Sequence, residues 1–280
     1  MPRLFCCGFG YSALGLARRL HRHGWEIAGT CRDEAKAASL EAEGFAVTRI
    51  GEDVKPADLA GITHFLASAP PDAAGDPVLA AYGAALAELR PAWIGYLSTT
   101  GVYGDRQGGW VDETSALEPT GERGRRRVAA ERAWTALEPA AHLFRLAGIY
   151  GPGRSALDTV RSGKAQRVIK LGQVFSRIHV EDIATVLEAS IAQPSPGTAY
   201  NLCDDDPAPP ADVLAYAATL LGVPPPPAVP FEAAELSEMA RSFYTDNKRV
   251  SNRRIKERLG VTLAYPDYRT GLKAILAAGG

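Results

Sequence analysis

The feature that most constrains the fold of this chain is a glycine-rich turn close to its start. A short apolar segment, Leu4–Cys7, runs directly into Gly8-Phe9-Gly10-Tyr11-Ser12-Ala13, and apolar residues then recur at helical spacing. Gly8 permits a tight turn, Gly10 lets a ligand approach the backbone because it has no Cβ, and Ala13 allows the helix to pack closely on the strand. The segment predicts a strand, a turn and a helix that begin a parallel α/β sheet.

The helix after this turn is expected to bind phosphate. Its first N–H groups have no partner within the helix, and the helix dipole places partial positive charge at the same end. The ligand that matches this pattern is a dinucleotide. An ordinary strand, turn and helix is the alternative, because glycines mark turns in every fold. The residues that we expect to hold the pyrophosphate are Gly8, Gly10, Tyr11, Ser12 and Ala13.

The end of the second predicted strand, Trp25–Thr30, indicates which dinucleotide is preferred. An Asp or Glu on the adenosine ribose is typical of NAD binding at this place, whereas an arginine accommodates the 2′-phosphate of NADP. The chain has Arg32 here, so we expect NADP in preference to NAD, with the guanidinium on the 2′-phosphate. Asp33 follows directly and keeps NAD as the alternative, since its carboxylate could reach the ribose.

Strands and helices alternate through the first half of the chain, which predicts an α/β fold with a doubly wound parallel sheet. Helices are expected over Asp76–Leu89 and Arg125–Leu137. The strands are expected at Leu4–Cys7, Trp25–Thr30, Phe45–Ile50, His64–Ser68, Trp93–Thr99 and His142–Leu146.

Beyond residue 150 the alternation weakens, and a smaller substrate lobe is expected. Helices are predicted at Ala156–Ser162 and Glu181–Ala192, and strands at Arg167–Leu171 and Ala199–Cys203. The last of these strands should return to the main sheet. We therefore expect a nucleotide-binding domain over 1–150, completed by 178–203, and a discontinuous lobe formed by 151–177 and 204–280. The linkers expected in this lobe are Asp204–Pro210 and the proline-rich Val223–Pro230.

Composition narrows the classes of partner. The chain has 280 residues, of which 46% are hydrophobic and 22% charged, and its formal net charge is −1. This is the composition of an ordered globular protein, and so small a charge gathers neither nucleic acid nor an anionic membrane. We expect a small-molecule substrate as the partner. No stretch reaches the roughly 18 apolar residues that a membrane helix needs, and no signal peptide is apparent, so a cytoplasmic protein is expected.

The cysteines point to packing and not to chemistry. They form no Cys-x-x-Cys pair and no Cys/His spacing typical of a metal site. We therefore expect thiols buried in the core and no bound metal. The four residues are Cys6, Cys7, Cys31 and Cys203.

Four further segments occur in an order that is typical of one enzyme family. They are Ala67-Ser68-Ala69-Pro70, Leu97–Gly104, Arg145–Gly153 and Ile178–Ala184. Together with the glycine turn they resemble the motifs of the extended short-chain dehydrogenase/reductase family, which contains sugar-nucleotide epimerases and dehydratases. The resemblance covers almost the whole chain and implies a nicotinamide cofactor, NADP or NAD, that contacts Ala67, Ser68 and Ala69. It also implies a homodimer through the helices at Asp76–Leu89 and Arg125–Leu137.

The family's proton-transfer chemistry uses a Ser or Thr, a Tyr and a Lys, and this chain departs from that set. The resemblance places Thr99 at the hydroxyl position, Arg123 at the tyrosine position and Arg127 at the lysine position. A guanidinium stays protonated and accepts no hydrogen bond, so Arg123 cannot exchange a proton as a tyrosine can. Arg127 could still hold the nicotinamide ribose. The alternative is a solvated helix face on which Arg127 pairs with Glu131.

A substitute acid or base would have to come from another part of the chain. The resemblance places Tyr103, Tyr150 and His179 near the substrate, with packing as the alternative for the tyrosines and helix capping as the alternative for the histidine. The catalytic residues that we expect are Thr99, Tyr103 and Arg127.

The resemblance therefore implies an NAD(P)-binding oxidoreductase or epimerase that acts on a small polar or sugar-like substrate without the usual Tyr-x-x-x-Lys pair. The alternative is a non-catalytic NADP-binding sensor, which the missing tyrosine favours. The substrate-side lobe and the segment around Thr99 favour the enzyme, because a sensor requires neither.

Overall fold

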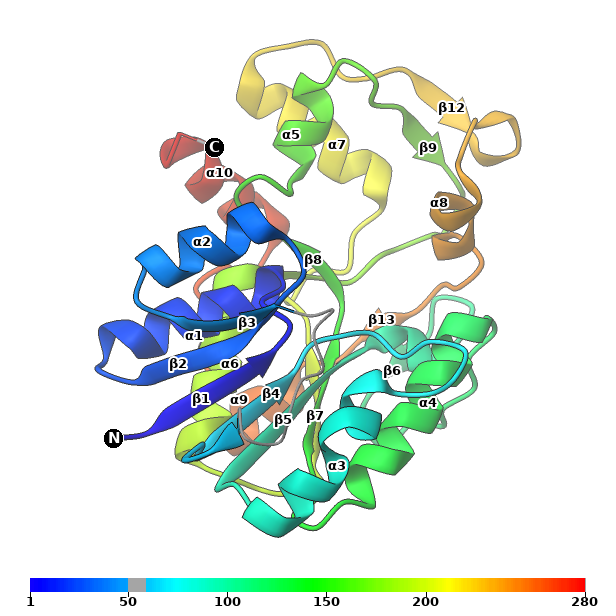
Figure 1. Ribbon diagram of the computed structural model, residues 1–280. Helices are drawn as coiled ribbons and strands as arrows, with labels where there is room; N and C mark the ends of the chain where they lie inside the picture. Colours follow the sequence, from blue (N-terminus) through cyan, green and yellow to red (C-terminus); the bar gives the residue numbers. More distant parts are fainter. Residues whose placement is uncertain (50–58, 280) are drawn as a thin grey trace. The chain divides into compact units, whose positions relative to one another are not determined.

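The computed structural model describes residues 1–49 and 59–279, and a seven-stranded sheet organises it (Figure 1). The strand order is β11-β7-β5-β4-β1-β2-β3, so the sheet grows in both directions from β1. This reversal defines a doubly wound α/β fold, with the switch point beside β1. The strands are β1 (Arg3–Cys7), β2 (Glu26–Cys31), β3 (Ala46–Arg49), β4 (His64–Ala67), β5 (Trp93–Thr99), β7 (His142–Leu146) and β11 (Ala199–Leu202).

Six of the seven strands agree with the sequence pattern because they are mostly buried runs, whereas β3 at the edge of the sheet is exposed or half-buried. The pairs β1–β2, β1–β4, β2–β3 and β4–β5 are all parallel. β11 joins the sheet beside β7, which confirms the returning strand. Ile50, the last residue of one expected strand, lies outside the described residues. The sheet thus confirms the predicted fold class.

The described part of the chain contains ten α-helices, which Figure 1 labels. The helix expected from Arg125 in fact begins at Glu122. The helices are α1 (Tyr11–Arg22), α2 (Glu34–Ala42), α3 (Pro77–Leu89), α4 (Glu122–Thr135), α5 (Ala156–Arg161), α6 (Val180–Ala192), α7 (Pro210–Leu221), α8 (Glu238–Phe243), α9 (Arg253–Leu259) and α10 (Tyr268–Ala277).

Short strands and 3-10 turns complete the described structure. The segment Val223–Pro230, expected to be a linker, is a linker only in part, because its last three residues form β12, which pairs in parallel with β9. Two further pairs, β8 with β10 and β6 with β13, are also parallel. These elements are β6 (Trp110–Val111), β8 (Gly148–Tyr150), β9 (Arg167–Ile169), β10 (Arg177–His179), β12 (Ala228–Pro230), β13 (Arg249–Val250), η2 (Thr100–Tyr103) and η3 (Phe231–Ala233).

The chain divides into two compact units. Their boundary differs from the expected one near residue 150, because β6 pairs with the late strand β13 and so groups with the second half of the chain. Unit 1 consists of Met1–Thr99, Arg126–Arg145 and Ile183–Tyr200. Unit 2 consists of Thr100–Arg125, Leu146–Asp182 and Asn201–Gly280.

An aromatic core holds the first strand of unit 1 in place. Phe5 of β1 stacks on Phe65 of β4, with ring centroids 5.6 Å apart. Tyr82 of α3 and Trp134 of α4 close around Phe65 from the same cluster. Because interiors of this kind are close-packed, the strand that leads into the glycine turn has little freedom to move.

The four cysteines are free and buried, which confirms the expectation of core thiols. Burial raises the pKa of Cys7 to about 11, and the pKa of Cys6 is raised further for the same reason. Among residues 1–49 and 59–279 no group of His, Cys, Asp and Glu has the arrangement of a metal site. Within the same residues, no helix has both the length and the apolar character that crossing a membrane requires.

We expect Gly29 to tolerate no side chain. A Cβ on this residue of β2 would collide with the carbonyl oxygen of Cys6 and would lie 2.8 Å from Cζ of Phe9. Gly29→Ala should therefore lower the free energy of unfolding by about 1–3 kcal/mol, the range for overpacking. Gly83→Ala is the matched control, since a Cβ there meets Leu79 Cδ2 at 3.7 Å. It should stabilise α3 by about 0.5–1 kcal/mol. Urea unfolding followed by circular dichroism measures both, and equal effects would contradict this account.

Candidate functional site

The glycine turn after β1 is pinned to the neighbouring strand. Gly8 has a φ of +93°, a left-handed conformation that favours glycine. Its N–H donates to Oγ1 of Thr30 at 2.8 Å, and the N–H of Phe9 donates to the carbonyl oxygen of the same threonine at 2.9 Å. The turn thus has one conformation before any ligand is present.

The end of α1 at this turn has no side-chain cap. Gly10 is its N-cap, with no side-chain hydrogen bond, and the first turn contains no acidic residue. By contrast, Asp33 caps α2 through the N–H of Lys36 at 2.7 Å, and Asp76 caps α3. The positive end of α1 therefore lacks the side-chain acceptor that helix ends usually have.

Space for a phosphate exists over Gly10. A Cβ built on this glycine would find Oγ of Ser68, at 3.8 Å, as its nearest heavy atom. Gly10 is exposed, and Tyr11 is half-buried at the start of α1. Ser12 and Ala13 are buried, so their side chains pack inside the protein and only their backbone N–H groups contribute to this end of the helix. The turn therefore fits the pyrophosphate of a dinucleotide.

The loop after β4 closes on the glycine turn. Oγ of Ser68 donates to the carbonyl oxygens of Gly8 and Cys7. A Cβ on Gly8 would lie 2.9 Å from Oγ of Ser68, so glycine is the residue that fits beneath this serine. Ala67 is buried in β4, and Ala69 is half-buried. Ser68 is therefore the residue that joins this loop to the turn.

Arg32 and Asp33 differ in their engagement at the end of β2. The Asp33 carboxylate accepts from the N–H of Lys36, which places that oxygen at the end of α2. Arg32 is exposed, and in the described part of the chain it takes part in no ion pair within 4.0 Å. The guanidinium is thus the group whose donors are available for an anion here.

A buried carboxylate supports the end of β5. Glu131 of α4 accepts from Oγ of Ser98 at 2.6 Å and from Nη2 of Arg145 at 2.7 Å. Nε of Arg145 also donates to both carboxylate oxygens, at 3.1 and 3.2 Å. Glu131 and Arg145 are only 2% and 5% exposed, so water does not screen the pair. The alternative in which Glu131 pairs with Arg127 on a solvated face is therefore wrong.

Arg127 lies against β5 instead. Its Nη1 donates to the carbonyl oxygen of Leu97 at 2.6 Å and to the hydroxyl of Tyr96 at 3.1 Å. The side chain is half-buried. The strand that carries Thr99 as its last residue therefore also holds the Arg127 guanidinium. Arg123, one turn earlier on α4, is exposed and lies 6.0 Å from the ring centroid of Phe243.

The three candidate proton-transfer residues lie in unit 2, and all are buried. The Tyr103 hydroxyl donates to Oδ1 of Asn201 at 2.7 Å, and the Tyr150 hydroxyl donates to the carbonyl oxygen of Asp267 at 3.3 Å. Nδ1 of His179 accepts from the N–H of Glu181, as a helix cap does. These contacts favour the packing and capping alternatives over proton transfer, and the catalytic role of Tyr103 stays a prediction.

Burial also shifts the pKa values of two of these residues, Tyr150 and His179, so that neither exchanges a proton readily near pH 7. It raises the pKa of the Tyr150 hydroxyl, to which nearby Asp204 adds, and lowers the pKa of His179 to about 4. The histidine is therefore neutral at pH 7, and the tyrosine holds its proton firmly.

Comparison with known proteins places the chain among relatives of full length. No family model matches it. It is 28% identical to Protein YeeZ of Escherichia coli K12 over 95% of this chain and 97% of that protein. A conserved protein of unknown function from Silicibacter pomeroyi has a solved structure with 54% identity, 99% coverage of both chains and a TM-score of 0.94. A protein from Methylobacillus flagellatus assigned to the NAD-dependent epimerase/dehydratases has 26% identity, 99% and 98% coverage and a TM-score of 0.71.

Removing one partner of the buried ion pair should strongly destabilise the protein. Arg145→Met leaves the Glu131 carboxylate uncompensated in the interior, and we expect a loss of about 3–5 kcal/mol in the free energy of unfolding. Arg18→Met removes the exposed bidentate pair with Glu43, and should cost about 1 kcal/mol or less. Chemical denaturation compares the two variants. If both variants lost the same free energy of unfolding, burial of the Glu131–Arg145 pair would not increase the cost of breaking it.

Proposed function

Because this chain belongs to the extended short-chain dehydrogenase/reductase family, we propose that it is an NADP-dependent oxidoreductase or epimerase acting on a small polar or sugar-like substrate. The observation that carries the proposal is the end of α1. It has no side-chain cap, no acidic residue in its first turn and open space over Gly10. A diphosphate supplies the negative charge that such a helix end lacks.

Different residues of the chain would bind the pyrophosphate, the nicotinamide ribose and the adenosine ribose of the cofactor. The backbone at Gly8 and Gly10 holds the pyrophosphate, and the loop at Ser68 borders it. Arg127, already fixed on β5 through Nη1, has Nε and Nη2 left to bind the ribose hydroxyls next to the nicotinamide. The bound nicotinamide supplies hydride transfer, which the protein need only position.

Arg32 selects the phosphorylated cofactor. Its guanidinium binds the 2′-phosphate through charge-assisted hydrogen bonds, and the nearby end of α2 adds a favourable dipole. The competing group, Asp33, has a carboxylate oxygen engaged by the N–H of Lys36 and so is less available to a ribose hydroxyl. This engagement supports NADP over NAD.

A charge reversal at Arg32 tests the cofactor preference. We expect Arg32→Glu to weaken NADPH binding by about tenfold or more, since charge-assisted hydrogen bonds contribute about 1.5–3 kcal/mol, and to leave NADH binding nearly unchanged. Arg22→Glu, on the exposed last turn of α1, is the control. Isothermal titration calorimetry measures both coenzymes. Equal affinity of the wild-type protein for NADPH and NADH would remove the proposal of NADP selectivity.

Thr99 is the residue that we propose for the substrate oxygen. It ends β5, next to Ser98, whose hydroxyl is bound by the buried Glu131 carboxylate. The hydroxyl of Thr99 can donate to a substrate carbonyl oxygen, while the proton that a family tyrosine would supply has no replacement in its position. General acid–base help is worth about 10²–10⁴-fold, so we expect slow turnover.

A second candidate function follows from the same contacts. Tyr103, Tyr150 and His179 are all engaged by the protein, which favours a sensor in which NADP occupancy stabilises one conformation. Ligand at 100 times its dissociation constant adds about 2.7 kcal/mol of stability, enough to bias a two-state arrangement.

Turnover decides between the two functions. NADPH absorbance should fall with at least one member of a panel of ketones, aldehydes and nucleotide sugars, or, because epimerisation leaves the nicotinamide unchanged overall, a nucleotide sugar should yield its epimer by NMR. Thr99→Ala should lower kcat by about 10²-fold because the oxygen is no longer held. Thr114→Ala, at an exposed loop threonine bound to Asp112, should leave kcat unchanged. NADPH binding without turnover of any compound would refute the enzyme and leave the sensor.

A further inference from the structure

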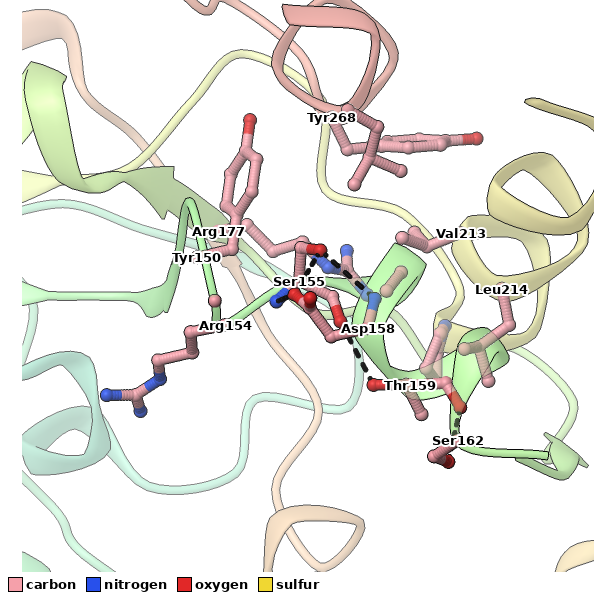
Figure 2. Close-up of a pocket in the computed structure, with 14 residues that line it drawn as sticks. Tyr150, Arg154, Ser155, Asp158, Thr159, Ser162, Arg177, Val213, Leu214 and Tyr268 are labelled. Atoms are coloured by element: carbon pink, nitrogen blue, oxygen red, sulfur yellow. Dashed lines mark hydrogen bonds between the residues drawn. The ribbon is translucent and has the colours of Figure 1, made fainter. Parts of the chain in front are cut away.

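A cavity of about 650 Å³ opens in unit 2, and its size is that of a small-molecule site. Helices α5, α7 and α10 line it together with residues from β8 and β10 (Figure 2). No residue of the glycine turn is among its lining, so its ligand need not be the dinucleotide.

One side of the cavity is an apolar wall. Val213 and Leu214 contribute to it from α7, and Tyr268 contributes from α10 (Figure 2). Leu272 of α10 also lines the cavity. Val213, Tyr268 and Leu272 also belong to the buried cluster in which α7 and α10 pack with Leu157 of α5. Because the same residues form the core and the wall, the wall exists before a ligand arrives.

A fixed cation, Arg177, also lines the cavity. Nη1 of Arg177 donates to the carbonyl oxygens of Phe175 and Ala208, at 2.8 and 3.0 Å. The side chain is half-buried and lines the cavity. Within residues 1–49 and 59–279, no protein acceptor bonds its Nε or Nη2, and no carboxylate pairs with it within 4.0 Å. Three of the five N–H donors of a guanidinium are therefore left for another acceptor.

The carboxylates near Arg177 do not neutralise it. Asp206 is paired with Arg269 at 2.7 Å, and Asp158 accepts from the N–H and Oγ of Ser155 at the start of α5. Burial raises the pKa of Asp204 to about 8, so this carboxyl is largely protonated at pH 7. Arg177 keeps its charge, although burial lowers its pKa. The cavity thus combines an apolar wall with a guanidinium that, within the described residues, has no carboxylate paired within 4.0 Å.

We propose that this cavity binds a small carboxylate with an apolar body. The carboxylate accepts from Nε and Nη2 of Arg177 in the bidentate geometry that a guanidinium favours, and the body lies against Leu214 and Tyr268. This site is additional to the cofactor turn and does not depend on the proposed enzyme activity, because all its lining residues belong to unit 2.

Binding of a model acid to the full chain tests the proposal. In calorimetry, 4-phenylbutyrate should bind saturably, and the neutral 4-phenylbutyramide should bind at least about tenfold more weakly because it cannot form a charged pair. Arg177→Met should weaken the acid by about tenfold, whereas Arg161→Met, at an exposed arginine of α5 outside the cavity, should have no effect.

A second variant covers the case in which Arg177→Met fails to fold, since Nη1 also holds two carbonyl groups. Leu214→Trp fills the cavity while keeping Arg177, and should abolish binding. Thr219→Trp, at an exposed position of the same helix, should not. The proposal is overturned if the acid shows no saturable binding at about 10 mM, if acid and amide bind equally, or if Leu214→Trp leaves the affinity unchanged.

Discussion

The carboxylate of Glu131 is the contact on which the arrangement of the candidate site depends. It joins α4 to Ser98 near the end of β5 and to Arg145 of β7, within the interior of the sheet unit. A buried charge is costly unless every oxygen has partners, and here Arg145 and Ser98 supply them. The end of β5, which carries Thr99, and α4, which carries Arg127, are therefore held in fixed positions relative to each other.

The N-termini of α1, α2 and α3 in unit 1 differ in whether a side chain caps them. Asp33 and Asp76 satisfy the first N–H groups of α2 and α3, as is usual when an end has no ligand. α1 begins with Gly10 and no side-chain cap. A glycine N-cap costs a helix about a few tenths of a kcal/mol relative to Ser, Thr, Asp or Asn, and an anion that binds at this place restores that stability. The contrast on neighbouring helices is a stronger indication of a phosphate site than the glycines alone.

The glycine turn, the sheet and most element boundaries could be predicted because their signals are local. β5 and β7 have the predicted bounds, since each is a buried run of largely apolar residues. The partner of Glu131 could not be predicted in the same way. Arg145 lies 14 residues further on in a different strand, whereas Arg127 lies on the same helix at the spacing of a surface pair.

A proline-rich segment shows the same limit of local reasoning. Val223–Pro230 has the composition of a linker, yet Ala228–Pro230 pairs with β9. Proline is tolerated in a two-stranded sheet because each strand has one edge on which no backbone N–H donor is needed. The cavity in unit 2 was likewise not visible in the sequence. Arg177 stands near a family motif, and only the fold brings it to the walls formed by α7 and α10.

The thiols before the glycine turn have a consequence for how the protein withstands oxidants. Cys6 and Cys7 stand directly before Gly8, but they are 0% and 6% exposed. Only a thiolate attacks peroxides or disulfides readily, and burial keeps both sulfurs protonated. The glycine turn therefore adjoins two sulfur atoms that oxidants do not readily reach, and oxidative stress should leave its shape intact.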